Sequence, residues 1–434
     1  MTNAIANKLQ SIVKSTTIVK QFSEADPSWQ TKIQRSILNF PESVCVVIPE
    51  TIEDLAAVVK TAKGEGWKIL PCGNGSKLDW GTLNRDVGLV VSTQKCARII
   101  EHAIDDLTVT VESGIKLADL QASLRATNQF LPIDPAFAES ATIGGILATA
   151  DTGSWRQQYG GIRDLVLGIS FIRGDGEITK AGGKVVKNVA GYDLMKLFIG
   201  SYGTLGIITR IAFRTYPIPE ASQTVILTGE AAQIDRAMAL LKNSGLTPTA
   251  ADLITASVAQ KLGITASVAL LVRFQTIPES IAAQTSQLTA MVADLALEID
   301  TYQDEVQQQL WHRLNEIVRV PQGDEVIICK FGILPTAGVE LLERAIEIDR
   351  DGCAMLHIGS GIGILQLTLN DVSAITTIRE FCNDNSGFLT VLTAPQAIKE
   401  NIDVWGYRGN ALEMMRMIQQ KFDPQQIFNC ELMK

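Results

Sequence analysis

The feature that most constrains this chain is a glycine-rich segment between residues 139 and 206. It holds 14 of the 34 glycines in the 434-residue sequence, and it is also rich in isoleucine, leucine and valine. Glycine lets a backbone press closely against another backbone or a ligand and adopt positive φ angles, whereas a flexible linker would lack the apolar residues. The segment therefore predicts ordered, tightly folded backbone. Either it surrounds a flat, phosphate-bearing ligand, or it forms a run of tight turns in an ordinary α/β protein.

The overall composition predicts a globular protein of two or three domains. Hydrophobic residues make up 46% of the chain, and its net charge of −9 argues against a nucleic-acid binder, which needs clustered basic residues. The N-terminus lacks the apolar stretch of a secretory signal, and no apolar run approaches the ~18 residues of a membrane span. The seven cysteines are scattered and never spaced CxxC, which predicts free thiols. We therefore expect a cytoplasmic protein that meets a membrane only through partners.

Hydrophobic patterning divides the chain into four segments. Residues 1–39 are predicted to be a helical segment, and residues 40–219 alternate strands and helices up to a change in composition. Residues 220–397 alternate strands and helices in an order that suggests a ferredoxin-like antiparallel sheet with helices on one face. Residues 398–434 contain a helix that we expect to return to the first domain.

Several common sites are absent from the sequence. Residues 73–78 and 359–364 each lack the third glycine of the dinucleotide fingerprint, and neither a P-loop nor a GxSxG elbow occurs. Three histidines in the whole chain are too few for a histidine-rich metal centre. The sequence therefore predicts no metal site, and neither a nicotinamide Rossmann enzyme nor a serine hydrolase.

What remains is phosphate binding by backbone amides at two glycine turns. The first turn, 72–77, follows a strand-like segment and offers successive N–H groups to an anion. The second turn, 140–145, precedes a predicted helix start. Two such turns suit a cofactor with two phosphates and a long planar ring. The predicted cofactor-binding residues of the two turns are Cys72, Gly73, Asn74, Gly75, Ser76, Lys77, Ser140, Ala141, Thr142, Gly144 and Gly145.

The two turns belong to a longer pattern. PCGNGS, SATIGG, YGGIRDLVLGISFIRGDGE and KNVAGYDLMKLFIGSYGTLGIIT follow in this order, and DPQQIFN lies near the C-terminus. The pattern resembles the PCMH-type FAD-binding domain of the vanillyl-alcohol oxidase family over roughly residues 40–219. Within that family, GGKVVKNVAGYDL is most similar to the FAD-binding subunits of glycolate oxidase. The resemblance implies an α+β fold: a two-subdomain PCMH-type FAD-binding domain and a ferredoxin-like antiparallel-sheet cap domain.

The resemblance also implies roles for residues outside the turns. The turns would hold the pyrophosphate, while Thr149 and Gly153 lie in a segment that would pass beneath the flavin. Gly206 and Ile207 would face the adenine side. Tyr192 lies in the family's GYDL segment and is a further cofactor-binding candidate, although helix capping and packing explain it equally well.

Two positions depart from the patterns of related enzymes. Some members of the family attach FAD covalently through a histidine in the first turn, where this chain has Ser76, so the resemblance implies non-covalent FAD. Related 2-hydroxy-acid dehydrogenases carry HxGDGN on a cap strand, whereas this chain has HIGSGI from His357 onward and lacks two of the polar groups. His357 is therefore either a base for the substrate's 2-hydroxyl or a hydrogen-bonded structural histidine.

The function that the resemblance implies is an FAD-binding oxidoreductase subunit of a glycolate dehydrogenase or oxidase complex. Its partners would be a catalytic flavoprotein subunit and an iron–sulfur subunit, because this chain has no clustered cysteines. The altered cap motif favours a supporting role in that complex. Two alternatives stay open: a self-sufficient FAD-linked dehydrogenase of D-lactate or another 2-hydroxy acid, and an assembly subunit whose flavin does not turn over. Arg156, Arg163 and Arg173 are available for a substrate carboxylate, but the sequence places none of them at the flavin.

Overall fold

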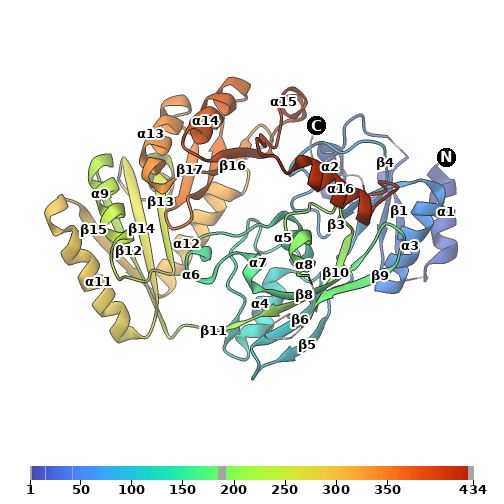
Figure 1. Ribbon diagram of the computed structural model, residues 1–434, viewed down its shortest axis with the longest axis horizontal. Helices are drawn as coiled ribbons and strands as arrows, with labels where there is room; N and C mark the ends of the chain where they lie inside the picture. Colours follow the sequence, from blue (N-terminus) through green and yellow to red (C-terminus); the bar gives the residue numbers. More distant parts are fainter. Residues whose placement is uncertain (1, 15, 42, 184–191, 429–434) are drawn as a thin grey trace. The chain divides into compact units, whose positions relative to one another are not determined.

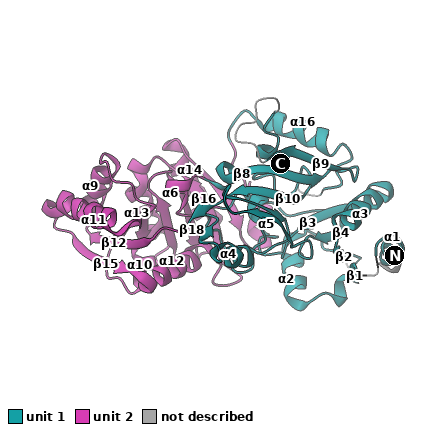
Figure 2. Ribbon diagram, turned by 90° about the horizontal axis from the view of Figure 1, so that it is seen from below, with its two compact units in different colours: residues 1–151, 161–217, 408–434 teal, residues 152–160, 218–407 magenta. Residues whose placement is uncertain are grey.

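The computed structural model describes residues 2–14, 16–41, 43–183 and 192–428. The contacts within the chain divide it into two compact units (Figure 2). The chain passes from unit 1 to unit 2 after Pro217, close to the boundary expected at residue 219. Segment 152–160 is assigned to unit 2 although its flanks belong to unit 1, a feature that the sequence did not indicate. Unit 1 comprises residues 1–151, 161–217 and 408–434, and unit 2 comprises residues 152–160 and 218–407.

The first sheet of unit 1 has the strand order β1-β2-β4-β3, with β2, β4 and β3 parallel and β1 antiparallel. Helix α3 begins directly after Thr51, because the Thr51 side chain accepts a hydrogen bond from the Asp54 amide and caps the helix. Helix α3 packs beside α1 (Figure 1). The elements are α1 (Thr2–Ile12), β1 (Ile18–Gln21), α2 (Pro27–Ser36), β2 (Cys45–Ile48), α3 (Ile52–Glu65), β3 (Lys68–Cys72) and β4 (Val87–Ser92).

The second sheet of unit 1 is antiparallel, with the order β5-β6-β10-β8-β9. Helix α4 buries Leu117, Leu120 and Leu124 on one face, and β8 and β9 form a hairpin. Helix α16 returns to this unit, where its Phe422 ring lies 5.5 Å from Phe198. The elements are β5 (Ile99–Ala103), β6 (Thr108–Glu112), α4 (Leu117–Arg125), β7 (Gln129–Phe130), α5 (Ile143–Thr149), α7 (Ile162–Leu165), β8 (Val166–Ile172), β9 (Ile178–Gly182), α8 (Met195–Phe198), β10 (Ile207–Arg214), β11 (Tyr216–Pro217) and α16 (Leu412–Phe422).

Unit 2 is built on one antiparallel sheet, β15-β12-β14-β13-β17-β18-β16-β19. Each half of the sheet follows the ferredoxin-like β-α-β-β-α-β order, so the predicted ferredoxin-like motif is present twice. The second strands of the two repeats, β13 and β17, pair with each other and form the seam. The first repeat contains β12 (Ala221–Gly229), α9 (Ala231–Lys242), β13 (Ala250–Thr255), β14 (Val268–Thr276), α11 (Pro278–Val292) and β15 (Glu298–Gln303). The second contains β16 (Ile327–Gly332), α13 (Gly338–Ile348), β17 (Cys353–His357), β18 (Ile362–Leu367), α14 (Val372–Asp384) and β19 (Phe388–Thr393).

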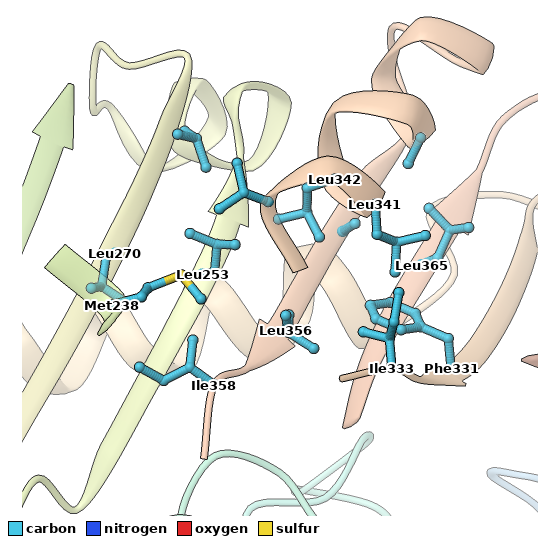
Figure 3. Packing of buried hydrophobic residues seen from close by; sticks show 14 of the residues in the cluster. Met238, Leu253, Leu270, Phe331, Ile333, Leu341, Leu342, Leu356, Ile358 and Leu365 are labelled. Atoms are coloured by element: carbon cyan, nitrogen blue, oxygen red, sulfur yellow. The ribbon is translucent and has the colours of Figure 1, made fainter. Parts of the chain in front are cut away.

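The two faces of this sheet differ in chemistry. One face is apolar and forms the core of unit 2 with helices α9, α11, α13 and α14, as Leu253, Leu270 and Leu356 illustrate (Figure 3). Side chains alternate along a strand, so the residues between these point to the opposite face. That face carries polar groups, among them Asp252 and His357. Helices α6 (Arg156–Tyr159), α10 (Ala256–Leu262) and α12 (Asp304–Arg319) contact strands of this sheet, and α15 (Gln396–Asn401) follows β19.

Within the described residues, no helix combines the length and the apolar character needed to cross a bilayer.

Candidate functional site

The two glycine turns predicted from the sequence lie side by side in unit 1. A Cβ atom on Gly73 would fall 1.9 Å from Thr142 Oγ1, so the turns approach this closely only because residue 73 is glycine. The Asn74 side-chain amide also donates a hydrogen bond to the Ser140 carbonyl, 3.2 Å away. The structure therefore brings the two predicted halves of one site together.

The first turn presents a row of backbone donors. Among the residues described, the amides of Gly73, Asn74, Gly75 and Ser76 have no hydrogen-bond partner. Gly73 and Gly75 are buried, and Gly75 has a φ of +71°. Buried backbone N–H groups are almost always paired, and successive amides in a turn form an anion-binding nest. The turn therefore fits a bound anion such as a phosphate group.

The second turn has fewer amides available than the sequence suggested. Thr142 caps α5 by accepting a hydrogen bond from the Gly145 amide, 3.3 Å away. The neighbouring amides of residues 141, 143 and 144 already donate to the carbonyl groups of Phe137, Ile115 and Ser113. A Cβ atom on Gly144 would lie 2.7 Å from Ser113 Cβ, so close packing accounts for that glycine. This turn serves mainly as the wall against which the first turn rests.

A buried ion pair links the first turn to the other end of α5. Lys77 Nζ lies 2.6 Å from Asp151 Oδ2, and 5% and 3% of the two side chains are exposed. The Ala136 amide also donates to Asp151, and the Trp80 ring lies 5.2 Å from the ammonium group. Burial and the Asp151 charge both raise the pKa of Tyr202, so its phenol stays protonated. Asp151 was not among the residues predicted from the sequence, where its only signal was its position directly after the helix in the glycine-rich segment.

The remaining cofactor-binding candidates of the sequence analysis have varied surroundings. The Thr149 hydroxyl donates to the Gly145 carbonyl within α5, and Gly153 is buried in segment 152–160 of unit 2. A Cβ on Gly206 would lie 2.5 Å from the Ile172 carbonyl oxygen, so the packing of β10 on β8 requires glycine there. Ile207 begins β10 and is buried, whereas 89% of Tyr192 is exposed. Residues 187–191, the KNVAG stretch that leads into the GYDL segment, lie outside the described residues.

The Cys72 thiol in the first turn is unreactive. Burial raises the pKa of its thiol to about 12, so the thiol is neutral at physiological pH. Only its backbone is a candidate for cofactor contact.

Unit 2 contains a second constellation, centred on His357. Its Nδ1 lies 2.6 Å from Asp252 Oδ1, and the Ser154 hydroxyl donates to the other carboxylate oxygen, Oδ2. All three residues are buried: 2% of His357, none of Asp252 and 4% of Ser154 is exposed. The sequence analysis singled out His357 but neither partner. The available signal was a lone acid, Asp252, within an otherwise apolar strand.

Positive charge near this face comes from an arginine that the sequence analysis did not select. Arg273 is 6% exposed, and its guanidinium lies 5.8 Å from the Trp155 ring and 5.6 Å from the Trp311 ring. Two of the arginines proposed from the sequence make local surface contacts instead: Arg163 donates to the Lys196 carbonyl, and Arg173 pairs with Asp175. Among the described residues, no group of three or more His, Cys, Asp or Glu side chains is arranged to hold a metal ion.

Comparison with known proteins indicates which ligand the two glycine turns of unit 1 fit. A family described as "FAD binding domain" matches residues 43–182, which include both glycine turns and the Lys77–Asp151 pair. The chain contains a PCMH-type FAD-binding domain. Its cofactor is FAD. The donors of the first turn fit the negatively charged pyrophosphate of that cofactor.

Sequence relatives of this FAD protein include glycolate oxidase subunits. It is 34% identical over 181 residues to glycolate oxidase subunit GlcD of Bacillus subtilis, across 42% of this chain and 38% of the relative. It is 42% identical over 130 residues to glycolate oxidase subunit GlcE of Escherichia coli, across 30% of this chain and 37% of the relative. A D-lactate dehydrogenase of Archaeoglobus fulgidus is 34% identical over 176 residues, across 41% of this chain and 39% of the relative. Each match thus spans about two fifths of the relative's length.

The fold extends further than the sequence similarity. The structure of p-cresol methylhydroxylase with bound substrate matches 98% of this chain and 95% of its own, with a TM-score of 0.74 and 14% sequence identity. At that identity the likeness concerns the fold alone. The PCMH-type FAD-binding fold and the cap-like antiparallel region expected from the sequence are confirmed.

Proposed function

We propose that the chain is the FAD-binding oxidoreductase subunit of a glycolate dehydrogenase or oxidase complex, converting a 2-hydroxy acid to a 2-oxo acid. The observation that carries the proposal is the combination of an anion nest in the FAD domain with a buried histidine–carboxylate pair in the cap unit. Similarity to both GlcD and GlcE supports the substrate class and the complex.

The residues of the first turn fit a non-covalently held FAD. Ser76 stands where some family members have a covalently linked histidine, and His357 and His102 both lie outside the turns. When bound, FAD accepts an electron pair together with the hydrogen on the substrate's C2 and releases electrons singly. The polypeptide would bind the pyrophosphate at residues 73–76 and accept the hydroxyl proton in the cap unit.

The electrons taken from the substrate must pass from this chain to an electron acceptor. The six cysteines described are free and do not form a cluster site, so we assign electron transfer to an iron–sulfur partner subunit. A second flavoprotein subunit completes the proposed complex. We place the complex in the cytoplasm, with any membrane contact made through its partners.

One observation favours a second candidate, a self-sufficient dehydrogenase of D-lactate or another 2-hydroxy acid. The altered cap motif suggested a supporting role, yet His357 is backed by Asp252 and Ser154 in the manner of an oriented base. This arrangement would let the chain oxidise substrate itself, with or without partners.

Affinity purification of the tagged full-length chain from its native host separates these candidates. The proposal predicts co-purification of a second flavoprotein and an iron–sulfur protein, and glycolate-dependent dye reduction that is lost when the partners are removed. A chain that purifies alone and reduces the dye at full rate with D-lactate would favour the self-sufficient enzyme. Unchanged activity of a complex whose subunit cannot bind FAD would indicate the assembly role.

A further inference from the structure

The seam between the two cap repeats places two titratable residues opposite each other. In the antiparallel pairing of β13 with β17, Asp252 is the direct partner of His357. Directly opposed residues point to the same face, with Cβ atoms ~5 Å apart, which is the separation that a carboxylate–imidazole hydrogen bond needs. The seam itself therefore determines that these two side chains meet.

The hydrogen bonds around Asp252 favour one position for the imidazole proton. A carboxylate only accepts hydrogen bonds, so with Asp252 as a carboxylate Nδ1 of His357 would donate to Oδ1, while the Ser154 hydroxyl donates to Oδ2. With its hydrogen on Nδ1, a neutral imidazole presents Nε2 as a bare acceptor. Among the described residues, Nε2 has no hydrogen-bond partner.

This pattern differs from that of a purely structural histidine. A structural histidine is usually hydrogen-bonded through both ring nitrogens, whereas the described hydrogen bonds of His357, a residue 2% exposed, involve Nδ1 alone. Asp252 is fully buried, and a buried carboxylate is costly to maintain for packing alone.

A second unpaired acceptor lies at the same end of the sheet. The Gln157 Oε1 atom is buried and has no partner among the described residues. It lies against the turn that follows His357, where a Cβ atom on Gly359 would fall 1.7 Å from it. An unpaired acceptor beside the turn that follows His357 suits a ligand that brings a hydrogen-bond donor.

We infer that Asp252 is a positioning residue that, together with Ser154, holds His357 as the acceptor of the substrate's 2-hydroxyl proton. The inference rests on the proposed function, because it requires a 2-hydroxy acid to be oxidised on this chain. The substrate O–H bond breaks and its proton goes to Nε2. The C2–H bond breaks and its hydrogen leaves with the electron pair to FAD, and the C2–O bond becomes the carbonyl of the 2-oxo acid. The carboxylate of Asp252 stabilises the positive charge that the ring then carries.

Nitrogen-15 NMR of the full FAD-loaded chain tests the inference directly. The chain has only three histidines, and a His357→Gln variant assigns the signals of residue 357. At neutral pH we expect a protonated Nδ1 and an unprotonated Nε2 in the wild type, and a shift of the hydrogen toward Nε2 in Asp252→Ala. A wild-type ring with its hydrogen on Nε2 would overturn the inference, even if Asp252→Ala did not fold.

A matched control removes a neighbouring hydrogen bond instead. The Thr249 hydroxyl donates to Gln158 Oε1 over 2.7 Å, joining the same segment 152–160 to the residue before β13. Thr249→Val should leave the His357 signals unchanged. An equal tautomer shift in both variants would mean that Asp252 acts only through general packing.

Anaerobic flavin reduction supplies the kinetic readout. We expect Asp252→Ala to slow reduction by a 2-hydroxy acid by about 10²–10⁴-fold, the usual contribution of a positioned base, with FAD affinity unchanged. Unaltered reduction rates in a folded variant would refute the positioning role. If no 2-hydroxy acid reduces the wild-type flavin although the tautomer is as expected, the proposed function fails while the assignment of the proton stands.

Discussion

Lys77 and Asp151 form a buried ion pair, 2.6 Å from Nζ to Oδ2, between the first glycine turn and the C-terminal end of α5. The N-terminal end of the same helix, at Thr142, touches Gly73 in that turn. The turn is therefore held at both ends of α5 by contacts within the protein. We infer that this bracing keeps the four free amides aligned before a cofactor arrives.

Breaking the pair on one side should be costly. Lys77→Met leaves the Asp151 carboxylate buried without its cation, and the loss of one partner of a buried pair typically lowers the free energy of unfolding by about 3 to 5 kcal/mol. Adding Asp151→Asn removes the stranded charge and should recover part of that loss. Urea unfolding at a fixed FAD concentration measures the two single variants and the double variant. Simple addition of the two single losses would show that the residues do not act as a pair.

The contact between the turns gives a prediction for FAD affinity. Gly73→Ala places a methyl group 1.9 Å from Thr142 Oγ1, so the turns must move apart. We expect FAD to bind at least about tenfold more weakly, measured by fluorescence titration of the apoprotein. Gly64→Ala is the control, because its Cβ would meet nothing within 4 Å and a helical alanine stabilises by up to ~1 kcal/mol. Equal affinities for the two variants would contradict the placement of the cofactor at the first turn.

Part of the fold could be predicted from the sequence because it depends on residues that are close together in the chain. The cap at Thr51, the buried leucines of α4 and the hairpin of β8 and β9 each follow from residues within one element. The meeting of the glycine turns was predicted from a family pattern that spans both. In contrast, Asp151 and Asp252 become meaningful only through partners that lie far away in the chain.

The doubled cap fold escaped prediction for a different physical reason. β15 is an edge strand whose side chains are mostly exposed, so its hydrophobic pattern is weak and its backbone pairing with β12 defines it. β17 has five residues, all buried, and lacks the alternation that marks a strand. Each repeat contains one of these two strands, so without them neither repeat is complete and the doubling could not be recognised.

Asp423 should make the stability depend on pH in the acid range. It is 1% exposed and accepts a hydrogen bond from the Phe428 amide, and burial is the largest influence, raising its pKa. Between the unfolded pKa of about 3.9 and the folded value, the folded protein binds more protons, so the free energy of unfolding falls as pH rises. In Asp423→Asn, the free energy of unfolding should fall less steeply as pH rises from about 4, and urea unfolding midpoints measured across this range test this. An unchanged pH profile would contradict the assignment.

Asp371 provides a control of opposite sign. It is an exposed N-cap of α14, and hydrogen bonds from the Ser373 hydroxyl and amide lower its pKa. Its contribution to stability is present above the unfolded pKa of about 3.9 and is lost as pH falls through the folded value. In the wild type, the Asp371 contribution makes the free energy of unfolding fall as pH falls, and Asp371→Asn should abolish that fall. Asp423→Asn, by contrast, should abolish a fall that occurs as pH rises.

Three cysteines should resist alkylation in the folded protein. Burial is the main cause that raises the pKa values of Cys96, Cys329 and Cys382, each to about 12. At pH 8 only about one thiol in 10⁴ would be ionised, and the thiolate is the reactive form. Iodoacetamide labelling followed by peptide mass spectrometry should show these residues unmodified until the protein is unfolded. Labelling of the native protein at the unfolded rate would contradict the burial that the structure shows.

The most direct test of the central claim is an anaerobic visible spectrum of the purified, FAD-loaded chain before and after glycolate or D-lactate is added. The account predicts a bound-flavin spectrum that bleaches with a 2-hydroxy acid in a single turnover, whereas continuous dye reduction needs the partner subunits, because the FAD domain and the His357–Asp252 pair belong to one polypeptide. A fully FAD-loaded chain whose flavin stays oxidised with both acids would contradict substrate oxidation on this chain.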